Sequence, residues 1–314
     1  MRLVSFVIPC YRSANTITGV VDELRAAMAE MPEYDSEYIL VNDCSPDNTF
    51  EVLRDLAEKD GRITAVDLAK NFGQHAALMA GLRRAEGEIA VCLDDDGQTP
   101  GSEVGKLLKK LDEGYDVVYA EYAHKQHAAW RNLGTVLNNR MTEIMLGKPK
   151  ELTITSYFAM RRFIVDEMLV YKNCYPYVEG LILRSTRRIG TVPVTHRARE
   201  EGESGYTLVK LFSLWMNGFT SFSVKPLRIA TWCGAIAAVL GFIYFVVIIV
   251  KHFVDSSIPE GWASTMALML LLGGVILLVL GMIGEYIGRI YMCINASPQY
   301  VERQVIRKRG LTEL

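Results

Sequence analysis

The chain lacks several features that would assign it to a common class of protein. Its six cysteines form no CxxC pair and have no histidine at metal-ligand spacing, so we expect reduced thiols in the cytosol or in a membrane. The glycine-rich patterns GxGxxG and GxxxxGK[ST] are absent, so the usual glycine loops for phosphate are excluded. Internal repeats and low-complexity segments are absent too. A formal net charge of -2 over 314 residues gives no sign of a nucleic-acid partner.

Long uncharged hydrophobic runs are confined to the last third of the chain. One run of 22 residues lies between Arg228 and Lys251, and a second of 24 residues lies between Glu260 and Glu285. At about 1.5 Å per helical residue, each run is long enough for the roughly 30 Å hydrocarbon core of a bilayer. Two buried core helices would need a far larger soluble domain to cover them. We therefore predict two transmembrane spans, at about 229–250 and 262–285.

Basic residues set the expected orientation of this hairpin. The short loop at 251–260 carries one lysine and two acidic residues, whereas five basic residues accompany or follow the end of the second span: Arg289, Arg303, Arg307, Lys308 and Arg309. The positive-inside rule then places both termini in the cytoplasm. The N-terminal stretch has no signal-peptide layout, because its apolar run is short and broken by Pro9. We predict a multi-pass protein of the cytoplasmic membrane whose first 225 residues are cytosolic.

Short apolar runs alternate with helical patterns in the soluble part. Five runs look like buried strands: LVSFVIP, YILVND, ITAVDLA, IAVCLDD and YDVVYAE. Helical patterns separate them at 16–30, 48–59, 74–85 and 102–113. This alternation predicts an α/β fold with a mostly parallel sheet covered on both faces, and such sheets bind ligands outside the carboxyl ends of their strands. Those ends carry Pro9-Cys10-Tyr11, Asn42-Asp43, Lys70-Asn71 and Asp94-Asp95-Asp96.

The three aspartates in VCLDDDGQTP place unusual negative charge at the end of the fourth strand. In an extended segment, Asp94, Asp96 and Gln98 face one side and Asp95 faces the other. Two carboxylates and an amide oxygen suit Mg²⁺ or Mn²⁺, with phosphate oxygens completing the coordination shell. The alternative is a solvated acidic turn that caps the next helix. The position after the fourth strand of the array favours the metal site.

Four segments in this order resemble the family 2 glycosyltransferases, which have the GT-A fold: SFVIPCYRSANTI, LVNDCSPDNT, KNFGQHAALMAGL and LDDDGQTP. Four downstream segments are similar to the membrane-anchored polyprenyl-phosphate glycosyltransferases of the bactoprenol glucosyltransferase and dolichyl-phosphate mannosyltransferase groups: HRAREEGESGYTLVKLF, FSVKPLR, GEYIGRIY and SPQYVERQVI. The resemblance covers nearly the whole chain. It implies a Rossmann-like cytosolic GT-A domain at 1–206, an amphipathic juxtamembrane segment at 207–225, a transmembrane hairpin at 226–294 and a basic cytosolic tail at 295–314.

The amphipathic segment at 207–225 has two interpretations. Its large apolar side chains recur at spacings of three or four residues with a single lysine among them, so it is suited to the headgroup region of a bilayer. It would then hold the catalytic crevice at the depth of lipid phosphates. The alternative is that it packs onto the soluble domain as an ordinary core face.

The resemblance also implies roles for individual residues. The nucleotide-sugar donor would be bound by Pro9, Tyr11, Asp43, Asn71, Asp94 and Asp95. A D-x-D-x-Q motif made of Asp94, Asp96 and Gln98 would hold Mg²⁺ or Mn²⁺ on the diphosphate. The acceptor's phosphate would be bound by Arg131, Arg199 and Ser204. The implied catalytic residues are Asp94, Asp96, Arg131 and Arg199.

The sequence departs from the family pattern in three places. The usual D-D-G-S is replaced by Asn42-Asp43-Cys44-Ser45, which leaves the nucleotide preference open. Gly205 stands where relatives have a lysine that could bind phosphate. A threonine and serine segment, TITS at 153–156, lies where many relatives carry an aspartate proposed as general base.

The missing aspartate bears on the acceptor. A sugar hydroxyl needs a positioned general base, usually a carboxylate, whereas a phosphate monoester with a second pKa near 6 is already largely a dianion at pH 7. Although Asp95 or Glu151 could still serve as a base, the pattern favours a phosphate acceptor. We predict inverting transfer of a sugar from a nucleoside-diphosphate sugar to polyprenyl phosphate, for modification of cell-envelope glycans or lipids. The alternatives are a same-fold enzyme acting on a glycan or lipid hydroxyl, and an inactive nucleotide-sugar-binding scaffold.

Charged residues near the end of the second span bear on assembly. Glu285 and Arg289 stand at i, i+4, where they either pair with each other or mark a subunit contact within the bilayer. We therefore expect the lipid bilayer and other copies of the chain, in a homo-oligomer, as partners beside the donor and acceptor.

Overall fold

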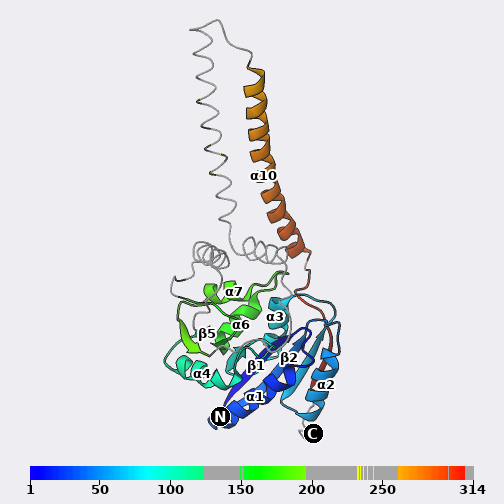
Figure 1. Ribbon diagram of the computed structural model, residues 1–314, viewed down its shortest axis with the longest axis vertical. Coiled ribbons are helices and arrows are strands. Elements are labelled where there is room, and N and C mark those ends of the chain that lie inside the picture. Colours follow the sequence, from blue (N-terminus) through cyan, green and yellow to red (C-terminus); the bar gives the residue numbers. More distant parts are fainter. Residues whose placement is uncertain are drawn as a thin grey trace. The chain divides into compact units, whose positions relative to one another are not determined.

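The computed structural model describes residues 1–122, 149, 152–195, 261–295 and 297–307, together with five single helical positions between 232 and 243. The chain divides into two compact units (Figure 1). The first contains Met1–Lys210 and Ala296–Leu314, and the second contains Leu211–Asn295.

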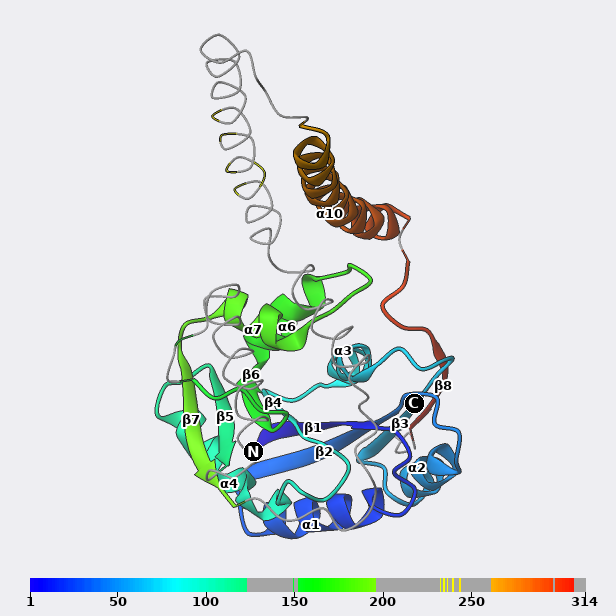
Figure 2. The same ribbon diagram turned by 45° about the horizontal axis from the view of Figure 1, so that its top comes forward.

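The first unit is built on an eight-stranded sheet with the order β7-β5-β6-β4-β1-β2-β3-β8 (Figure 2). Parallel pairs join β1 to β2 and β4, β2 to β3, and β5 to β7, whereas β6 and β8 run antiparallel to their neighbours. The prediction of a mostly parallel α/β sheet is therefore confirmed. The strands are β1 (Arg2–Cys10), β2 (Tyr34–Asn42), β3 (Ile63–Leu68), β4 (Ile89–Cys92), β5 (Val117–Tyr122), β6 (Phe158–Arg161), β7 (Ile189–Val194) and β8 (Glu302–Arg307).

Helices cover both faces of this sheet (Figure 2). One face carries α1 (Ile17–Ala29), α2 (Thr49–Lys59) and α4 (Val104–Asp112), the last preceded by the short 3₁₀ turn η1 (Gly101–Glu103). The other face carries α3 (Gln74–Arg84), α6 (Arg162–Val170) and α7 (Val178–Ser185). Each of the five predicted strand segments contains a strand, and each of the four predicted helical segments contains a helix.

The close fit of α3 against the sheet positions the start of that helix. A Cβ atom at Gly81 would lie 2.4 Å from Cγ1 of Val7 and 3.1 Å from Cγ2 of Val41, so only glycine allows this approach. Alternate residues of β1, including Phe6 and Ile8, pack on the opposite face with α1. The first residue of α3, Gln74, is therefore held beside the carboxyl ends of the central strands.

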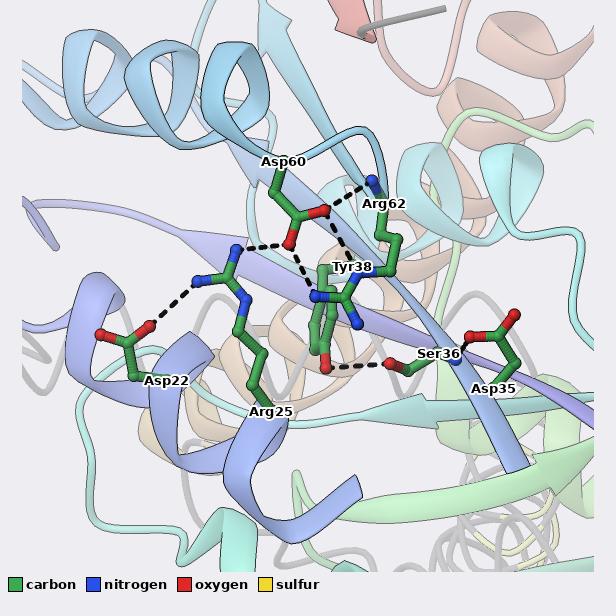
Figure 3. A network of polar contacts seen from close by, with 7 residues as sticks. All are labelled: Asp22, Arg25, Asp35, Ser36, Tyr38, Asp60 and Arg62. Carbon is green, nitrogen blue, oxygen red and sulfur yellow. Dashed lines mark hydrogen bonds and ion pairs between the residues drawn. The ribbon is translucent and has the colours of Figure 1, made fainter. Parts of the chain in front are cut away.

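A polar network lies at the other end of the sheet, at the amino ends of β2 and β3 (Figure 3). Asp60, just after α2, accepts hydrogen bonds from Arg25 of α1 at 2.7 Å and from Nη2 of Arg62 at 2.9 Å. Burial by itself would raise the pKa of Asp60, but the hydrogen bonds from Arg62 and Arg25 outweigh it and lower the pKa to about 2. The network ties α1, α2 and β3 together far from the strand ends that carry the aspartate triplet.

The second unit contains one long described helix, α10 (Trp262–Ile294). Within the described residues, Leu272–Ile294 of this helix is long and apolar enough to cross a membrane, judged by length and composition. The predicted second span at 262–285 lies in α10, which continues to Ile294. The predicted first span falls outside the described residues, apart from five positions that are helical: Trp232, Gly234, Ile236, Val239 and Ile243. The two-helix hairpin stays a prediction.

The segment expected to be a basic tail instead contributes β8 to the sheet. This strand runs antiparallel to β3, with Thr64 opposite Arg307 and Ala65 opposite Ile306. Ile306 packs against the core, and Nη1 of Arg307 lies 2.6 Å from Glu86. The strand ERQVIR has only two apolar residues among six, because its arginines pair with carboxylates along the sheet edge. Its sequence pattern is therefore too weak to distinguish it from a solvated tail.

Candidate active site

The polar residues predicted at the strand ends lie along one edge of the sheet. Pro9 is buried near the end of β1, and Tyr11, which follows that strand, is 46% exposed. Asp43 follows β2, and the exposed Asn71 follows β3. The aspartate triplet follows β4, which ends at Cys92. Because these strands are parallel neighbours, their carboxyl ends lie side by side at one end of the sheet, where sheets of this kind have their ligand crevice.

Asp94 is held from two sides. Its Oδ1 accepts a hydrogen bond from Nε2 of Gln74 at 2.8 Å, and its Oδ2 accepts one from the hydroxyl of Ser156. Burial raises the pKa of Asp94 to about 6, and the charges of Asp96 and Asp95 add to the rise, while the two hydrogen bonds oppose it. Both donors are neutral, so they fix the carboxylate without balancing its charge. A cation placed here would relieve that charge.

Asp95 points to the loop after β1. Its Oδ2 accepts hydrogen bonds from the backbone N–H of Tyr11 at 3.0 Å and from the hydroxyl of Ser13. Burial raises the pKa of Asp95, and these hydrogen bonds oppose the rise. Asp95 therefore fixes the backbone beside Tyr11, and to act as a general base it would have to release those donors.

The chain bends directly after the triplet. Gly97 has a φ of +71°, and the backbone N–H of Gln98 donates to Oδ1 of Asp96 at 3.1 Å, so the segment is a turn and not an extended strand. Within the described ranges no group of three His, Cys, Asp or Glu side chains has a metal-binding arrangement. Oxygen ligands are available from Asp94, Asp96 and the side-chain amide of Gln98. Such ligands fit a divalent ion that takes its further oxygens from a diphosphate.

Asp43 joins the loop after β2 to the loop before α3. Its two carboxylate oxygens accept hydrogen bonds from the backbone N–H groups of Phe72 at 2.7 Å and Gly73 at 2.8 Å. Asp43 is 4% exposed, and burial raises its pKa although the backbone hydrogen bonds oppose the shift. Asn71 donates to the backbone carbonyl of Asp43 at 3.3 Å. In this arrangement Asp43 shapes the crevice through its loops, and direct contact with a nucleotide base stays a prediction.

The TITS segment at 153–156 lies against the site. Thr153 donates to Glu121 at 3.3 Å, and Thr155 donates to the backbone carbonyl of Ala120 at 2.7 Å. Ser156 reaches Asp94 itself. A hydroxyl that orients the Asp94 carboxylate thus occupies the neighbourhood where a base was expected.

Three side chains orient the aspartates, and the sequence did not predict this role for any of them: Ser13, Gln74 and Ser156. They come from two loops and the start of α3, far apart in the chain, and no local pattern points from any of them to the aspartate triplet. Gln74 carried the nearest signal, because it begins a helix directly after a glycine in the loop that follows β3.

A buried polar cluster lies between α3 and α7. Nδ1 of His75 is 3.6 Å from Oε2 of Glu179, and the imidazole and the Tyr177 ring form a T-shaped pair with 5.1 Å between ring centroids. Among the described residues, Nδ1 of His75, Oε2 of Glu179 and the hydroxyl of Tyr119 have no hydrogen-bond partner. Burial, with a contribution from Glu179, raises the pKa of Tyr119. Glu179 is a carboxylate that the sequence analysis did not single out.

Several predicted residues lie outside the described residues: Arg131, Glu151, Arg199, Ser204, Gly205 and the segment at 207–225. Their roles stay predictions.

Comparisons with known proteins identify the family and the fold. The model of Glycosyl transferase family 2 matches residues 5–169, and that of the GtrB C-terminal hairpin matches residues 225–290. The fold is similar to that of glucosyl-3-phosphoglycerate synthase from Mycobacterium tuberculosis in complex with Mn²⁺, uridine diphosphate and phosphoglyceric acid, with a TM-score of 0.52 and 19% identity. That likeness covers 68% of this chain and 75% of the other.

Curated relatives are similar over nearly the full length. An undecaprenyl-phosphate 4-deoxy-4-formamido-L-arabinose transferase from Enterobacter sp. (strain 638) is 35% identical over 312 residues, covering 98% of this chain and 95% of the relative. An uncharacterized glycosyltransferase, YkcC, from Bacillus subtilis (strain 168) is 34% identical over 299 residues, covering 95% and 92%. From its sequence, its sheet and its strand-end aspartates, the chain belongs to glycosyl transferase family 2 and is a glycosyltransferase with a GT-A fold.

Proposed function

We propose that the protein transfers a sugar from a nucleoside-diphosphate sugar to undecaprenyl phosphate, or to a polyprenyl phosphate of the same chemistry, at the cytosolic membrane face. The observation that carries this proposal is the near full-length similarity to undecaprenyl-phosphate 4-deoxy-4-formamido-L-arabinose transferases.

The chemistry is an inverting displacement. An oxygen of the acceptor phosphate attacks the anomeric carbon, the bond from that carbon to the donor's diphosphate breaks, and the nucleoside diphosphate leaves with the bonding electrons. A donor with an α linkage gives a β-linked polyprenyl-phosphate sugar. Gln74 and Ser156 orient the Asp94 carboxylate, and Asp95 fixes the loop at Tyr11, so the donor meets a preformed crevice edge.

A divalent ion, Mg²⁺ or Mn²⁺, would be held by Asp94, Asp96 and Gln98. When bound, it would neutralise charge that develops on the departing diphosphate. Support comes from the chemistry of the donor set and from the pKa of Asp94, which burial raises and the charges of Asp96 and Asp95 raise further. Manganese and a uridine nucleotide occur together in the synthase of similar fold.

The acceptor side agrees with a phosphate nucleophile. A phosphate dianion needs no proton removed, so an active site without a base beside the sugar is sufficient. Where a base was expected, Ser156 binds Asp94, and Asp95 is engaged by the loop at Tyr11. We assign the acceptor phosphate to Arg131, Arg199 and Ser204, because arginine recognises phosphate in a bidentate manner.

Chain connectivity supports a membrane hairpin with both ends in the cytosol. Strand β8 belongs to the same sheet as β1 to β7, and α10 ends at Ile294, shortly before that strand begins. If α10 crosses a bilayer, its first residue, Trp262, lies on the other side of that bilayer from β8. The chain between Lys210 and Trp262 must then cross as well, and the uncharged run at 229–250 suits that crossing.

The decisive experiment measures transfer into lipid. Purified full-length protein in detergent is incubated with radiolabelled nucleotide sugars and undecaprenyl phosphate, with Mg²⁺ or Mn²⁺ or with EDTA. The matched control acceptor is undecaprenol, which presents a hydroxyl on the same hydrocarbon. Label should enter the organic phase with the phosphate and metal, and not with the alcohol. Transfer to undecaprenol, or no transfer from any donor, would contradict the proposal.

The hairpin has its own test. A cysteine introduced as Ser257→Cys in the predicted loop should react with a membrane-impermeant maleimide in intact cells. The matched variant Gln304→Cys in β8 should add to the labelling of the native cysteines only after the cells are opened. The reverse pattern, or equal labelling of both, would contradict the topology.

A further inference from the structure

Asp67 connects the end of β2 to strand β8. This carboxylate is 4% exposed, and its Oδ1 accepts a hydrogen bond from Nδ2 of Asn42 at 2.7 Å. Its Oδ2 accepts one from Nη1 of Arg303 at 3.1 Å. A buried carboxylate is costly unless its oxygens are satisfied, so the positions of Asn42 and Arg303 depend on each other through Asp67.

The guanidinium group of Arg303 makes a second contact. Its Nη2 donates to the backbone carbonyl of Ala69 at 3.0 Å, and the N–H of Ala69 donates to the carbonyl of Val301 at 2.8 Å. Ala69 begins the loop that continues through Asn71 to Gly73 at the start of α3. One side chain on the returning strand therefore holds both the end of β3 and the start of a crevice loop.

From Asn42 the contacts continue to the loops after β2 and β1. Its Oδ1 accepts a hydrogen bond from the backbone N–H of Ser45 at 3.1 Å, and Oγ of Ser45 accepts one from the N–H of Arg12 at 3.2 Å. Arg12 and Cys44 have φ values of 60° and 53°, which are uncommon for residues other than glycine. These two loops thus adopt a backbone that side-chain contacts must maintain.

The asparagine at position 42 fits this chain of contacts. An amide can donate to Asp67 and accept from Ser45 at the same time, as it does here. An aspartate at the same place would bring two carboxylates into contact. The departure from D-D-G-S is therefore matched to Asp67 and Arg303, which belong to a different part of the sequence.

We propose that Arg303 is a positioning residue of the donor site, and that the strand returning from the membrane hairpin completes the nucleotide crevice through Asp67 and Asn42. The proposal rests on the function proposed above, because it takes the crevice to bind a nucleoside-diphosphate sugar. Only residues 295–301 separate α10 from β8 in the sequence, so the anchor and the donor loops are joined by a short connection.

Strand docking alone is the competing explanation, and β8 offers a matched control for it. Arg307 lies on the same strand and pairs with Glu86 at 2.6 Å, and Glu302 pairs with Arg84. These contacts fasten the strand to residues at the end of α3, away from the loops of the crevice. Replacing Arg307 weakens docking without breaking the chain from Asp67 to Ser45.

The experiment compares Arg303→Met, Arg303→Lys and Arg307→Met in the full-length protein in detergent. Dissociation constants for UDP, GDP, CDP and dTDP with Mn²⁺ are measured by titration calorimetry, and donor KM and kcat by transfer to undecaprenyl phosphate. Arg303→Met should weaken nucleotide binding and raise donor KM by about 10- to 100-fold, as misplaced positioning groups do, with a smaller change in kcat. Arg303→Lys should be intermediate, because an ammonium replaces the fork. Arg307→Met should leave nucleotide binding unchanged within about twofold.

Two outcomes would overturn the inference: unchanged nucleotide binding in Arg303→Met, or an equal loss in Arg307→Met. If the wild type binds nucleotide and the variants behave as expected but no label enters lipid, the proposed function fails and the positioning role stands. If the wild type binds no nucleoside diphosphate, both fail.

Discussion

Gln74 and Asp94 are joined by a hydrogen bond of 2.8 Å between the first turn of α3 and the end of β4. The position of Gln74 follows from the seat of α3 on the sheet, where Gly81 lies against Val7 and Val41. The geometry of the acidic site therefore depends on packing at a glycine seven positions further along the helix.

The first prediction concerns that glycine. Gly81→Ala would place a Cβ 2.4 Å from Cγ1 of Val7, so α3 must shift away from the sheet. We expect a loss of about 1 to 3 kcal/mol in the free energy of unfolding, as is usual for overpacking, together with weaker metal binding. The matched control is Gly19→Ala in α1, whose added Cβ meets nothing within 4 Å. Chemical denaturation of both variants checks the prediction, and equal stability would contradict it.

A second prediction follows from the pKa of Asp94, which burial raises to about 6. Metal binds the ionised carboxylate, so affinity for Mn²⁺ should fall as the pH is lowered through about 6. Calorimetric titration with Mn²⁺ between pH 5 and pH 8 measures this. Affinity that is constant across the range would show that Asp94 is not a ligand.

The same shift affects stability without metal, with the opposite sense. The folded pKa of Asp94, about 6, lies above the value near 3.9 of an unfolded aspartate, so the folded state binds the proton more tightly. The contribution of Asp94 is fully present below about pH 4 and is lost as the pH rises through about 6. Saturating Mn²⁺ should restore thermal stability at pH 7.

A third prediction separates the hydroxyls of the TITS segment. Ser156 donates to Asp94 and thereby lowers its pKa, so Ser156→Ala should raise that pKa and move the midpoint of metal binding to higher pH. Thr153→Ala removes a hydroxyl from the same segment that bonds Glu121 instead, and should leave the midpoint in place. Identical pH profiles for the two variants would rule out the role of Ser156.

A fourth prediction tests the metal assignment directly. Asp96→Ala should abolish metal-dependent sugar transfer while membrane insertion is retained, because Asp96 lies in the turn after β4 and outside the apolar segments. The control Asp35→Ala removes an exposed carboxylate at the opposite edge of the sheet and should stay active. Transfer assays and membrane fractionation of both variants provide the comparison. Full activity of Asp96→Ala would exclude this residue as a ligand.

Most of the sheet could be predicted because its central strands are buried on both faces and form continuous apolar runs. The helices between them follow the helical period, and the strand-end aspartates therefore fell at the correct edge. Strand β8 could not be predicted, since an edge strand with two arginines has the composition of a solvated tail. Its place depends on Asp67, Glu86 and Arg84, which are more than two hundred residues away.

The place of the aspartates after the fourth strand was predictable from the sequence, and their hydrogen-bond partners were not. The spacing of Asp94, Asp95 and Asp96 places carboxylates in the crevice, but it does not reveal that Asp95 holds the β1 loop while Asp94 is held by Ser156. Those contacts depend on the turn at Gly97 and on loops brought together by the fold. Tertiary contacts of this kind leave no local period in the sequence.

The last prediction concerns the network at the amino ends of β2 and β3 (Figure 3). Asp60 accepts hydrogen bonds from Arg25 and Arg62, and its pKa is lowered to about 2 against roughly 3.9 for an unfolded aspartate. Because the folded pKa is the lower one, the stabilisation is present above about pH 4 and is lost as the pH falls toward 2. Asp60→Asn should therefore lower the free energy of unfolding at pH 7 by about 1 to 3 kcal/mol, with a difference that shrinks in acid.

The control for Asp60→Asn is Asp55→Asn, which removes an exposed carboxylate 3.8 Å from Arg54 and should change stability by less than about 0.5 kcal/mol. Denaturation curves from pH 7 to pH 3 distinguish the two, and a loss in Asp60→Asn that persists unchanged at pH 3 would show that packing, and not charge, accounts for the effect.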